Sequence, residues 1–352
     1  MHLLVVGGGS AGHVIPAIPV MAKLLERGDT VSFVGTTSGL EEGLVDHLDV
    51  HYQSIQAGKL RRYFSWENLV DVFRVLLGIF QSLGVLIKRR PDVVFSKGGF
   101  VSFPVVFAAW LLRIPVLAHE SDLSPGLANK LVMPFVATLS TSFKETQISR
   151  QNLTVVHVGT PIRDELLNGN QQAGLALLGF DDHKPLLLIV GGSLGADYLN
   201  QVIWQAAPQL ASQYNICHVC GAGKQSLLKL PGYVELEYVS QGWGDILAAA
   251  DIVVSRAGAN SLFELLALRK LNLLVPLGAK ASRGDQIENA QIAAAAGYSL
   301  VVQEDELNEA SLLTALQNLA DQRLEYEKVL AQFETPNATD KLVAEIDRLI
   351  SK

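Results

Sequence analysis

The sequence predicts an α/β protein of two domains, each built on a parallel sheet that helices cover on both faces. Short apolar segments alternate with amphipathic segments along nearly the whole chain. The length of 352 residues exceeds what one hydrophobic core usually supports. A glycine-rich loop follows an apolar segment twice, at residues 7–12 and 191–195, about one domain length apart. Each loop is expected to present backbone N–H groups and a helix N-terminus to an anion.

In the first domain the alternation predicts strands joined by helices. The expected strands are residues 3–6, 31–34, 92–96, 114–119 and 155–158, and the expected helices are residues 15–27, 41–47 and 69–87. The polar segment 169–172 lies near the domain boundary, so the first domain is expected to span residues 1–163.

The second domain, residues 164–335, repeats the pattern. Its expected strands are residues 186–190, 216–220, 234–238, 252–255 and 271–275. Residues 336–350 predict a last helix with Asn337 or Thr339 as its N-cap.

Composition and charge exclude several classes of protein. The chain is 49% hydrophobic and 18% charged, which is typical of a folded protein and not of a disordered one. Its net charge of −7 is uneven, because residues 1–150 carry 14 Lys and Arg against 12 Asp and Glu. We expect no nucleic-acid partner. Met1 and His2 lead directly into the first expected strand, so we expect no secretory signal. Cys217 and Cys220 lie three residues apart on a strand and point to opposite faces, so we expect no redox or metal role.

The apolar helix 69–87 leaves two interpretations open. Its longest uncharged stretch, residues 75–87, is too short to span a bilayer. Cations flank the helix on both sides, with Lys59, Arg61 and Arg62 before it and residues 88–90 after it. It is either a buried helix whose last cations complement its dipole, or an apolar patch with a basic rim that rests on an anionic membrane.

The first glycine loop matches only half of the dinucleotide-binding fingerprint. Gly7, Gly9 and Gly12 have the right spacing, but the fingerprint also needs an acidic residue at the end of the second strand. Gly35 and two threonines stand there instead. We therefore expect neither a nicotinamide nor a flavin, and no other cofactor.

Eight segments, in order along the chain, resemble the MurG family. They are residues 8–16, 58–62, 96–104, 119–130, 158–163, 191–196, 255–264 and 285–290. That family comprises the glycosyltransferases that add N-acetylglucosamine to undecaprenyl-diphosphate-linked N-acetylmuramoyl-pentapeptide. The resemblance implies the GT-B fold, in which two Rossmann-like domains face each other across a cleft and the helix at 336–352 packs back on the first domain. The chain departs from the usual family pattern at Ser10-Ala11 and at Ser121-Asp122.

The donor, UDP-N-acetylglucosamine, is expected on the second domain. Residues 255–264 read as a strand end, a glycine turn and a helix start, which suits a diphosphate, with Asn260 or Ser261 as the cap. Glu264 either holds the ribose, as the resemblance implies, or closes a capping box with Ser261. The resemblance assigns the sugar ring to Gln286 and Asn289, and the uracil edge to the backbone near Val239. The implied donor contacts are Ser10, Ala11, Gly12, Asp122, Arg163, Ser193, Val239, Ala259, Asn260, Ser261, Leu262, Phe263, Glu264, Gln286 and Asn289.

The first domain is expected to hold the acceptor and the base. Its two glycine turns face the acceptor's diphosphate, with Gly9, Lys97, Gly98 and Gly99 as the implied contacts. His13 is the expected general base, because an imidazole at a helix N-terminus stays neutral and can accept a proton. Glu120 orients His13 or serves as the base itself. The chain has no Asp-x-Asp metal clamp, so helix N-termini, Ser193 and Arg163 would stabilise the departing UDP without a metal.

These expectations place an inverting transferase at the cytoplasmic face of the cell membrane as a peripheral protein. Its partners would be UDP-N-acetylglucosamine, the lipid-linked muramoyl-pentapeptide acceptor and an anionic membrane surface contacted through residues 59–90. Proteins of cell-wall synthesis and division are further candidate partners. Three alternatives stay open, of which the first shares the fold and the donor. They are a UDP-N-acetylglucosamine 2-epimerase, a transferase that makes glycolipids from diacylglycerol, and a non-catalytic nucleotide-sugar sensor or scaffold.

Overall fold

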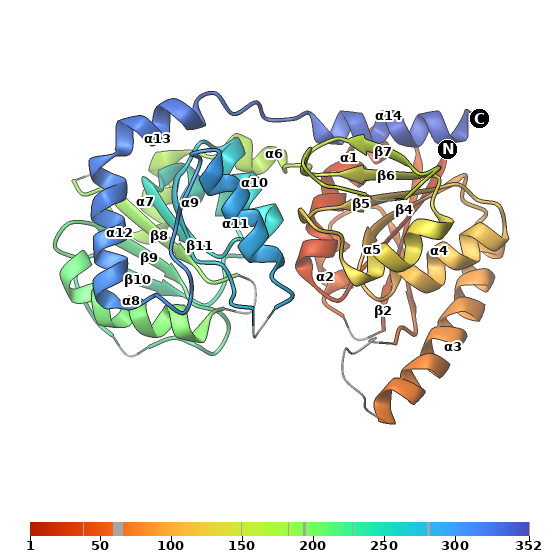
Figure 1. Cartoon of the computed structure of the whole chain (residues 1–352), viewed down its shortest axis with the longest axis horizontal. Coiled ribbons are helices and arrows are strands. Elements are labelled where there is room, and N and C mark those ends of the chain that lie inside the picture. Colours follow the sequence, from red (N-terminus) through yellow and green to blue (C-terminus); the bar gives the residue numbers. More distant parts are fainter. Residues whose placement is uncertain are drawn as a thin grey trace. The chain divides into compact units, whose positions relative to one another are not determined.

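The computed structural model divides the chain into two compact units. Unit 1 comprises Met1–Pro161 together with Pro336–Lys352, and unit 2 comprises Ile162–Thr335 (Figure 1). The structure describes residues 1–351 apart from 38, 59–65, 149, 182, 193–194, 227 and 280–281, and for residues 66–70 it describes the backbone alone.

The described part of unit 1 contains a seven-stranded parallel sheet in the order β3-β2-β1-β4-β5-β6-β7. The strands are β1 His2–Gly7, β2 Thr30–Thr36, β3 His51–Ile55, β4 Val93–Gly98, β5 Val116–Glu120, β6 Thr138–Thr141 and β7 Thr154–His157. The central strands read as continuous apolar segments because helices cover both of their faces.

Helices cover the two faces of this sheet. They are α1 Ile18–Glu26, α2 Glu41–Val45, α3 Trp66–Arg89, α4 Ser102–Leu111, α5 Leu127–Val132 and α14 Ala338–Ile350, with the 3-10 turns η1 Ala11–His13, η2 Ile15–Ala17 and η3 Met133–Phe135. Leu3 and Val5 face a core shared with α1 and α14. Leu4 and Val6 face a core shared with α3 and α4. The last helix of the chain thus completes the core of the first unit.

Unit 2 repeats the architecture with a six-stranded parallel sheet in the order β10-β9-β8-β11-β12-β13 among its described residues. The strands are β8 Leu186–Val190, β9 Asn215–Val219, β10 Tyr233–Leu236, β11 Ile252–Ser255, β12 Leu271–Leu274 and β13 Leu300–Val301. The helices are α6 Asp164–Leu167, α7 Gln171–Leu178, α8 Asp197–Leu210, α9 Trp243–Ala249, α10 Ala259–Ala267, α11 Asp285–Ala295, α12 Glu309–Asp321 and α13 Arg323–Leu330. Leu187 and Ile189 pack with residues of α8 and α12.

The strand order of each sheet reverses at one point, and that point locates the expected ligand site. In unit 1 the chain runs outward from β1 through β2 on one side and through β4 on the other. In unit 2, β8 stands between β9 and β11 in the same way. Open α/β sheets bind ligands at the carboxyl ends of the strands beside such a switch point. Both glycine loops of the sequence lie there, at the ends of β1 and β8.

The predicted fold class, two α/β domains with parallel sheets, is confirmed, and some element bounds need correction. The helix predicted over 15–27 begins as a 3-10 turn and is α-helical only from Ile18, since Pro16 and Pro19 supply no backbone N–H. Strands β3, β6 and β13 were not predicted. The strand predicted over 234–238 ends at Leu236. Asn337 is the N-cap of α14, as one of the two alternatives states, and accepts the backbone N–H of Asp340.

Candidate functional site

The first glycine loop is built around His13. The carbonyl of Gly8 accepts a hydrogen bond from His13 Nδ1 at 3.0 Å, and the Ser10 hydroxyl lies 3.0 Å from the same nitrogen. A Cβ on Gly7 would lie 2.2 Å from the carbonyl oxygen of His13, so only glycine fits there. The loop therefore folds back on itself and fixes the histidine ring at the carboxyl end of β1.

A second glycine turn, after β4, lies against the other edge of the ring. Gly98 has φ +100° and Gly99 has φ +85°, which L side chains rarely adopt. A Cβ on Gly98 would lie 3.3 Å from Cδ2 of His13 and 3.6 Å from its Nε2. The close approach of Gly98 leaves the two glycine turns on either side of one imidazole, as expected for neighbouring strands at a switch point.

Lys97, which is expected to contact the acceptor's diphosphate, turns into the protein. Its ammonium group is buried, and it donates to Nδ1 of His119 and to Oγ of Ser121, each at 2.5 Å. His119 in turn reaches the Gly159 carbonyl through Nε2 at 3.0 Å. Burial lowers the pKa of Lys97 to about 7, although Glu120 and Asp122 partly oppose the shift. The charge of Lys97 is thus directed into the protein because β5 lies beside β4.

Glu120 is also buried, and its oxygens are used by its own loop. Oε1 accepts the backbone N–H of Asp122, while Oε2 accepts the N–H of Gly126 and the amide of Asn129. Burial, followed by the neighbouring Asp122, raises the pKa of Glu120. These bonds shape the loop after β5 and tie it to α5.

Gly9 also departs from the expected diphosphate contact. Its N–H donates to Oε1 of Glu41 at 2.7 Å. In the structure this N–H is thus bonded to a side chain of unit 1 itself.

In unit 2 the turn between β11 and α10 is open. Gly258 is the N-cap of α10, and no side chain caps the helix, so the expected caps Asn260 and Ser261 and the Ser261–Glu264 capping box are wrong. A Cβ on Gly258 would meet no atom within 4 Å. The backbone N–H groups in the first turn of an α-helix have no partner within the helix, and such a helix start can hold a phosphate.

Glu264 lies in the second turn of α10 and faces Arg163. Arg163 Nη2 lies 3.7 Å from Glu264 Oε1, and Nη1 lies 2.7 Å from Oε1 of Glu165. Burial raises the pKa of Glu264 to about 7, and Arg163 opposes part of the shift. A carboxyl group held beside a cation at a helix start can accept hydrogen bonds from two adjacent hydroxyls.

The remaining expected donor residues of unit 2 differ in how exposed their side chains are. Gln286, at the start of α11, accepts the N–H of Leu277 at 3.0 Å and is partly exposed. Asn289 is fully buried, and its amide donates to the Ala257 carbonyl, so it links α11 to the turn before α10. Leu262 and Phe263 are buried, and Val239 lies beyond the end of β10. Ser193 lies outside the described residues.

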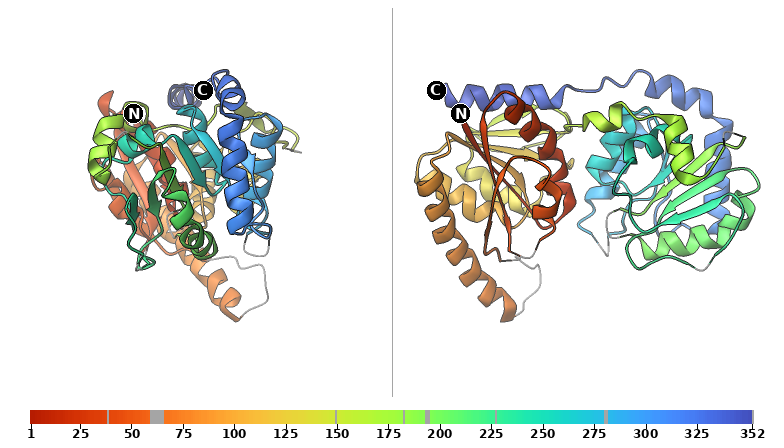
Figure 2. Two further views of the ribbon diagram at one scale, coloured as in Figure 1. Left: turned by 90° about the vertical axis from the view of Figure 1, so that its left-hand side faces the viewer. Right: turned by 180° about the vertical axis from the view of Figure 1, so that it is seen from behind.

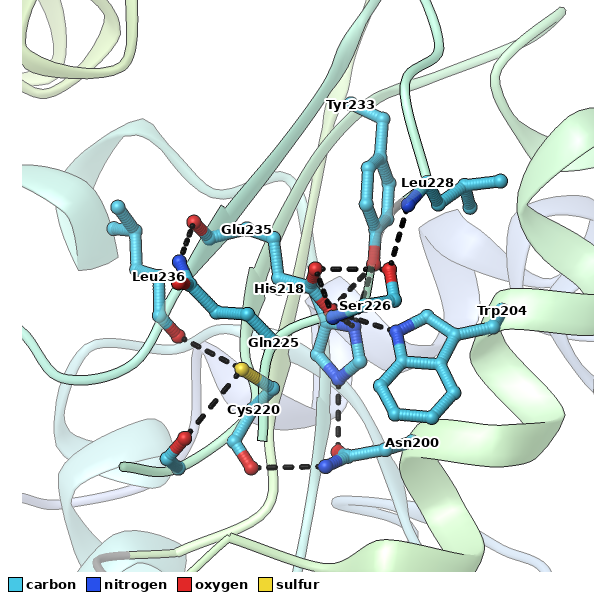
Figure 3. Close-up of polar contacts among 11 residues, drawn as sticks. Asn200, Trp204, His218, Cys220, Gln225, Ser226, Leu228, Tyr233, Glu235 and Leu236 are labelled. Atoms are coloured by element: carbon cyan, nitrogen blue, oxygen red, sulfur yellow. Dashed lines mark hydrogen bonds and ion pairs between the residues drawn. The ribbon is translucent and has the colours of Figure 1, made fainter. Parts of the chain in front are cut away.

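Behind the second glycine loop lies a buried polar cluster that Figure 3 draws. His218 contacts Tyr233 Oη through Nδ1 at 2.8 Å and Asn200 Oδ1 through Nε2 at 3.0 Å. The amide of Asn200 donates to the Cys220 carbonyl, against which Gly195 packs so closely that a Cβ would lie 2.0 Å away. Burial lowers the pKa of His218 to about 4, so the ring is neutral. The cluster holds the end of β9 against the loop.

Both cysteines belong to the same region and are buried thiols. Burial raises the pKa of Cys217 to about 12 and that of Cys220 to about 11. Cys220 Sγ donates to the Leu236 carbonyl at 3.3 Å. Among the described residues, no group of three or more His, Cys, Asp or Glu side chains could hold a metal ion.

Comparisons with known proteins match both units. The glycosyltransferase family 28 N-terminal domain matches residues 3–140, and the glycosyltransferase family 28 C-terminal domain matches residues 186–343. A protein of Legionella pneumophila (strain Lens) is 47% identical over 96% of this chain and 94% of its own length. One of Clostridium kluyveri is 45% identical over 98% and 99%. Both are named UDP-N-acetylglucosamine–N-acetylmuramyl-(pentapeptide) pyrophosphoryl-undecaprenol N-acetylglucosamine transferase.

The crystal structure of Acinetobacter baumannii MurG is similar to this chain with a TM-score of 0.76 and 26% identity, covering 99% of both chains. The chain belongs to the MurG family of glycosyltransferases. A UDP-GlcNAc 2-epimerase from Neisseria meningitidis has a TM-score of 0.72 at 16% identity, which shows a shared fold alone. The MurG family membership extends over both units and the last helix.

Sequence reasoning missed two side chains of this MurG family site. Glu41 is fully buried at the start of α2 and reaches the first glycine loop. Arg256 reaches the Val275 carbonyl at 3.2 Å and pairs with Glu304, which also accepts the N–H of Gly278. Arg256 directly follows strand β11, and this position was the available signal for it. Glu41 follows no strand directly, and the contact partners of both residues are distant in the sequence.

Proposed function

We propose that the chain transfers N-acetylglucosamine from UDP-N-acetylglucosamine to the undecaprenyl-diphosphate-linked N-acetylmuramoyl-pentapeptide. The observation that carries the proposal is the 43–47% identity, across 96–98% of the chain, to enzymes named for this reaction. The residues of both switch points fit the chemistry, because unit 2 offers an open helix start with a buried carboxyl group and unit 1 offers a fixed imidazole.

The donor is held by unit 2 in this proposal. Its diphosphate lies at the open N-terminus of α10, where Gly258 leaves room and the helix dipole favours negative charge. Glu264 accepts hydrogen bonds from the ribose hydroxyls, and the Gln286 amide forms hydrogen bonds with the N-acetylglucosamine ring. Arg163 offsets the charge of Glu264 and stabilises the negative charge of the departing UDP. The resemblance adds Ser193, Val239, Ala259, Asn260, Ser261, Leu262, Phe263 and Asn289 from unit 2, and Ser10, Ala11, Gly12 and Asp122 from unit 1, as further donor contacts.

His13 is the proposed base. Since the Gly8 carbonyl accepts from Nδ1, the neutral ring carries its hydrogen there, and Nε2 is the nitrogen that takes up a proton. The acceptor's C4 hydroxyl gives this proton to Nε2 while its oxygen attacks the anomeric carbon and the bond to UDP breaks, which inverts the configuration. Glu120 shapes the neighbouring loop. The acceptor's diphosphate is proposed at the Gly98 and Gly99 turn, with the buried Lys97 behind it and Gly9 oriented by Glu41.

The test is transfer of labelled N-acetylglucosamine to a short-chain lipid-linked acceptor. We expect transfer by the wild-type chain and a loss of about 10²–10⁴-fold in kcat for His13→Ala, the usual contribution of a general base. His47→Ala, on an exposed histidine of the same unit, is the matched control. A His13→Ala loss below tenfold refutes the base assignment. Formation of the manno epimer from the donor alone, without transfer, would support the 2-epimerase alternative instead.

We further propose that α3 places unit 1 on an anionic membrane at the cytoplasmic face. Its apolar side chains at 72, 73, 76, 77, 80 and 87 are exposed, whereas Asp71, Ser82 and Leu86 on the opposite face are buried. Gly78 lets the helix approach the carbonyl of Gln56, where a Cβ would lie 2.2 Å away. The helix is therefore buried on one side only, and a contiguous apolar stripe on the other is typical of an interfacial helix.

The surroundings of this stripe support the same proposal. Trp110 and Leu111 at the end of α4, which packs against α3, are also half exposed. Lys88 and Arg90 add exposed positive charge at the end of the helix. Figures 1 and 2 show the first turns of α3 extending beyond the sheet of unit 1. The cations predicted at Lys59, Arg61 and Arg62 lie outside the described residues. No helix among the described residues is both long and apolar enough to traverse a bilayer.

A further inference from the structure

We propose that Glu41 is a positioning residue for His13, acting through the peptide bond between Gly8 and Gly9. The inference rests on the proposed function, since it gives the proposed base an orienting group. Neither the glycine fingerprint nor the family resemblance assigns a role to Glu41. The argument depends on contacts within unit 1 alone.

Glu41 is fully buried and turned toward the loop. Its Oε1 accepts the N–H of Gly9 at 2.7 Å, and the Thr36 hydroxyl lies 3.1 Å from both carboxyl oxygens. The Tyr52 hydroxyl, from β3, donates a hydrogen bond to the Thr36 carbonyl at 3.0 Å and so holds the end of β2 beside Glu41. A buried carboxyl group is costly unless its oxygens accept hydrogen bonds, so this placement is fixed by its partners.

The other end of the Gly8–Gly9 peptide faces the histidine. The Gly8 carbonyl accepts from His13 Nδ1 at 3.0 Å. One rigid planar unit therefore donates its N–H to Glu41 and accepts the imidazole N–H with its carbonyl. Hydrogen bonds in such a chain polarise one another, so the acceptor at Glu41 strengthens the carbonyl that holds the ring.

The glycines around this peptide fit the arrangement and leave little freedom. A Cβ on Gly8 would lie 2.5 Å from Glu41 Oε1, and a Cβ on Gly39 would overlap its carboxyl group. A Cβ on Gly99 would lie 2.0 Å from the Gly8 carbonyl oxygen. The peptide is thus enclosed between β1, α2 and the turn after β4, and its direction sets which imidazole nitrogen carries the hydrogen.

A general base needs a third group that fixes its tautomer. In this chain the Gly8 carbonyl is that group. The Glu41 carboxyl group holds the same peptide in place by accepting the N–H of Gly9. If Glu41 loses its accepting oxygen, the Gly9 N–H is left without its partner and the peptide can rotate. His13 then samples the tautomer with the hydrogen on Nε2, which cannot accept the proton of the acceptor hydroxyl.

The tautomer can be measured directly. We would label the histidines with ¹⁵N, record imidazole nitrogen–proton correlations at pH 8, and identify the His13 signals among the eight histidines with His13→Gln. Glu41→Met removes the acceptor at nearly constant shape, whereas Glu41→Gln keeps an accepting oxygen. Glu42→Gln, on the exposed neighbour, is the matched control. Thr36→Val removes the hydroxyl that contacts both oxygens of the Glu41 carboxyl group. This variant replaces Glu41→Met in the test if Glu41→Met does not fold.

We expect wild type, Glu41→Gln and Glu42→Gln to carry the His13 hydrogen on Nδ1, and Glu41→Met or Thr36→Val to show a second, Nε2–H form. The kcat of Glu41→Met should fall by about tenfold or more, while Glu41→Gln stays within about threefold. The KM for the donor should stay within about twofold, since most donor contacts lie in unit 2. Folded Glu41→Met with an unchanged tautomer overturns the inference. A shifted tautomer with unchanged kcat upholds the role of Glu41 and refutes His13 as the base.

Discussion

Replacing Phe73 and Phe80 with serine should release the chain from anionic membranes. The two rings are 67% and 70% exposed and lie two turns apart on the same face of α3. Full burial of a phenylalanine side chain is worth about 1.5–3 kcal/mol, so burying the exposed two-thirds of each ring contributes about 1–2 kcal/mol. For both rings this amounts to about 2–4 kcal/mol, or roughly 30- to 1000-fold in the membrane partition constant.

The assay is co-sedimentation with vesicles of phosphatidylglycerol and phosphatidylcholine, from which a partition constant is obtained. Leu324→Ser is the matched control, because Leu324 is 81% exposed but belongs to α13 of unit 2. It should change the partition constant by less than about threefold. Activity on a water-soluble acceptor should be unaffected in both variants, since α3 contributes nothing to the proposed base or donor site. A Phe73→Ser/Phe80→Ser variant with unchanged unfolding temperature and a partition constant within threefold of wild type would refute the reasoning.

Buried charged groups and glycines lead to four further expectations. Glu264→Gln should raise the donor KM about tenfold or more in steady-state kinetics, yet raise the unfolding temperature at pH 8 and not at pH 4. The reason is that its pKa of about 7 lies above the unfolded value, so wild-type stability is lost as the pH rises through 7. Because the pKa of Lys97 is lowered to about 7, the free energy of unfolding measured in urea should rise between pH 7 and 10. Lys97→Met should remove that rise. Gly99→Ala should cost more than about 3 kcal/mol in urea unfolding, because of its left-handed backbone and its contact with the Gly8 carbonyl. Gly258→Ala should leave stability within about 0.5 kcal/mol and raise the donor KM instead.

The sequence was sufficient for the fold class because the central strands are buried on both faces. Strand β1 reads as an unbroken apolar segment before a glycine loop, and β8 does the same one domain later. Strand β6 gave no such signal. It is fully buried but consists mostly of hydroxyl side chains, and its Ser140 donates to the Ala118 carbonyl of β5. A strand whose polar groups bond to its neighbour cannot be told from a loop by hydrophobicity.

The candidate site was predictable only where its chemistry is local. His13 follows the first glycine loop directly, and Glu264 lies only six residues after Gly258, in the second turn of α10. Lys97 was expected to contact the acceptor's diphosphate because it stands where a strand ends in a glycine turn. Its burial depends on the pairing of Ser96 with Ala118, which brings His119 alongside. Glu41 was missed because its partner Gly9 is 32 residues away in the sequence.

The two glycine loops, alike in sequence, differ in what their glycines permit. Around the first loop the missing Cβ atoms make room for the chain itself, since Gly8 and Gly99 pack on a carboxyl group and a carbonyl. At the second site Gly191 and Gly195 pack closely too, since a Cβ would lie 2.7 Å from the Ala196 nitrogen and 2.0 Å from the Cys220 carbonyl oxygen. A Cβ on Gly192 or Gly258, however, would meet no atom of the described residues within 4 Å. A loop closed by its own contacts can orient a base, whereas a loop that stays open can admit a diphosphate. The open positions at Gly192 and Gly258 therefore suit the proposed donor site of unit 2, and the closed first loop suits the proposed base of unit 1, although both loops follow a buried strand at a switch point.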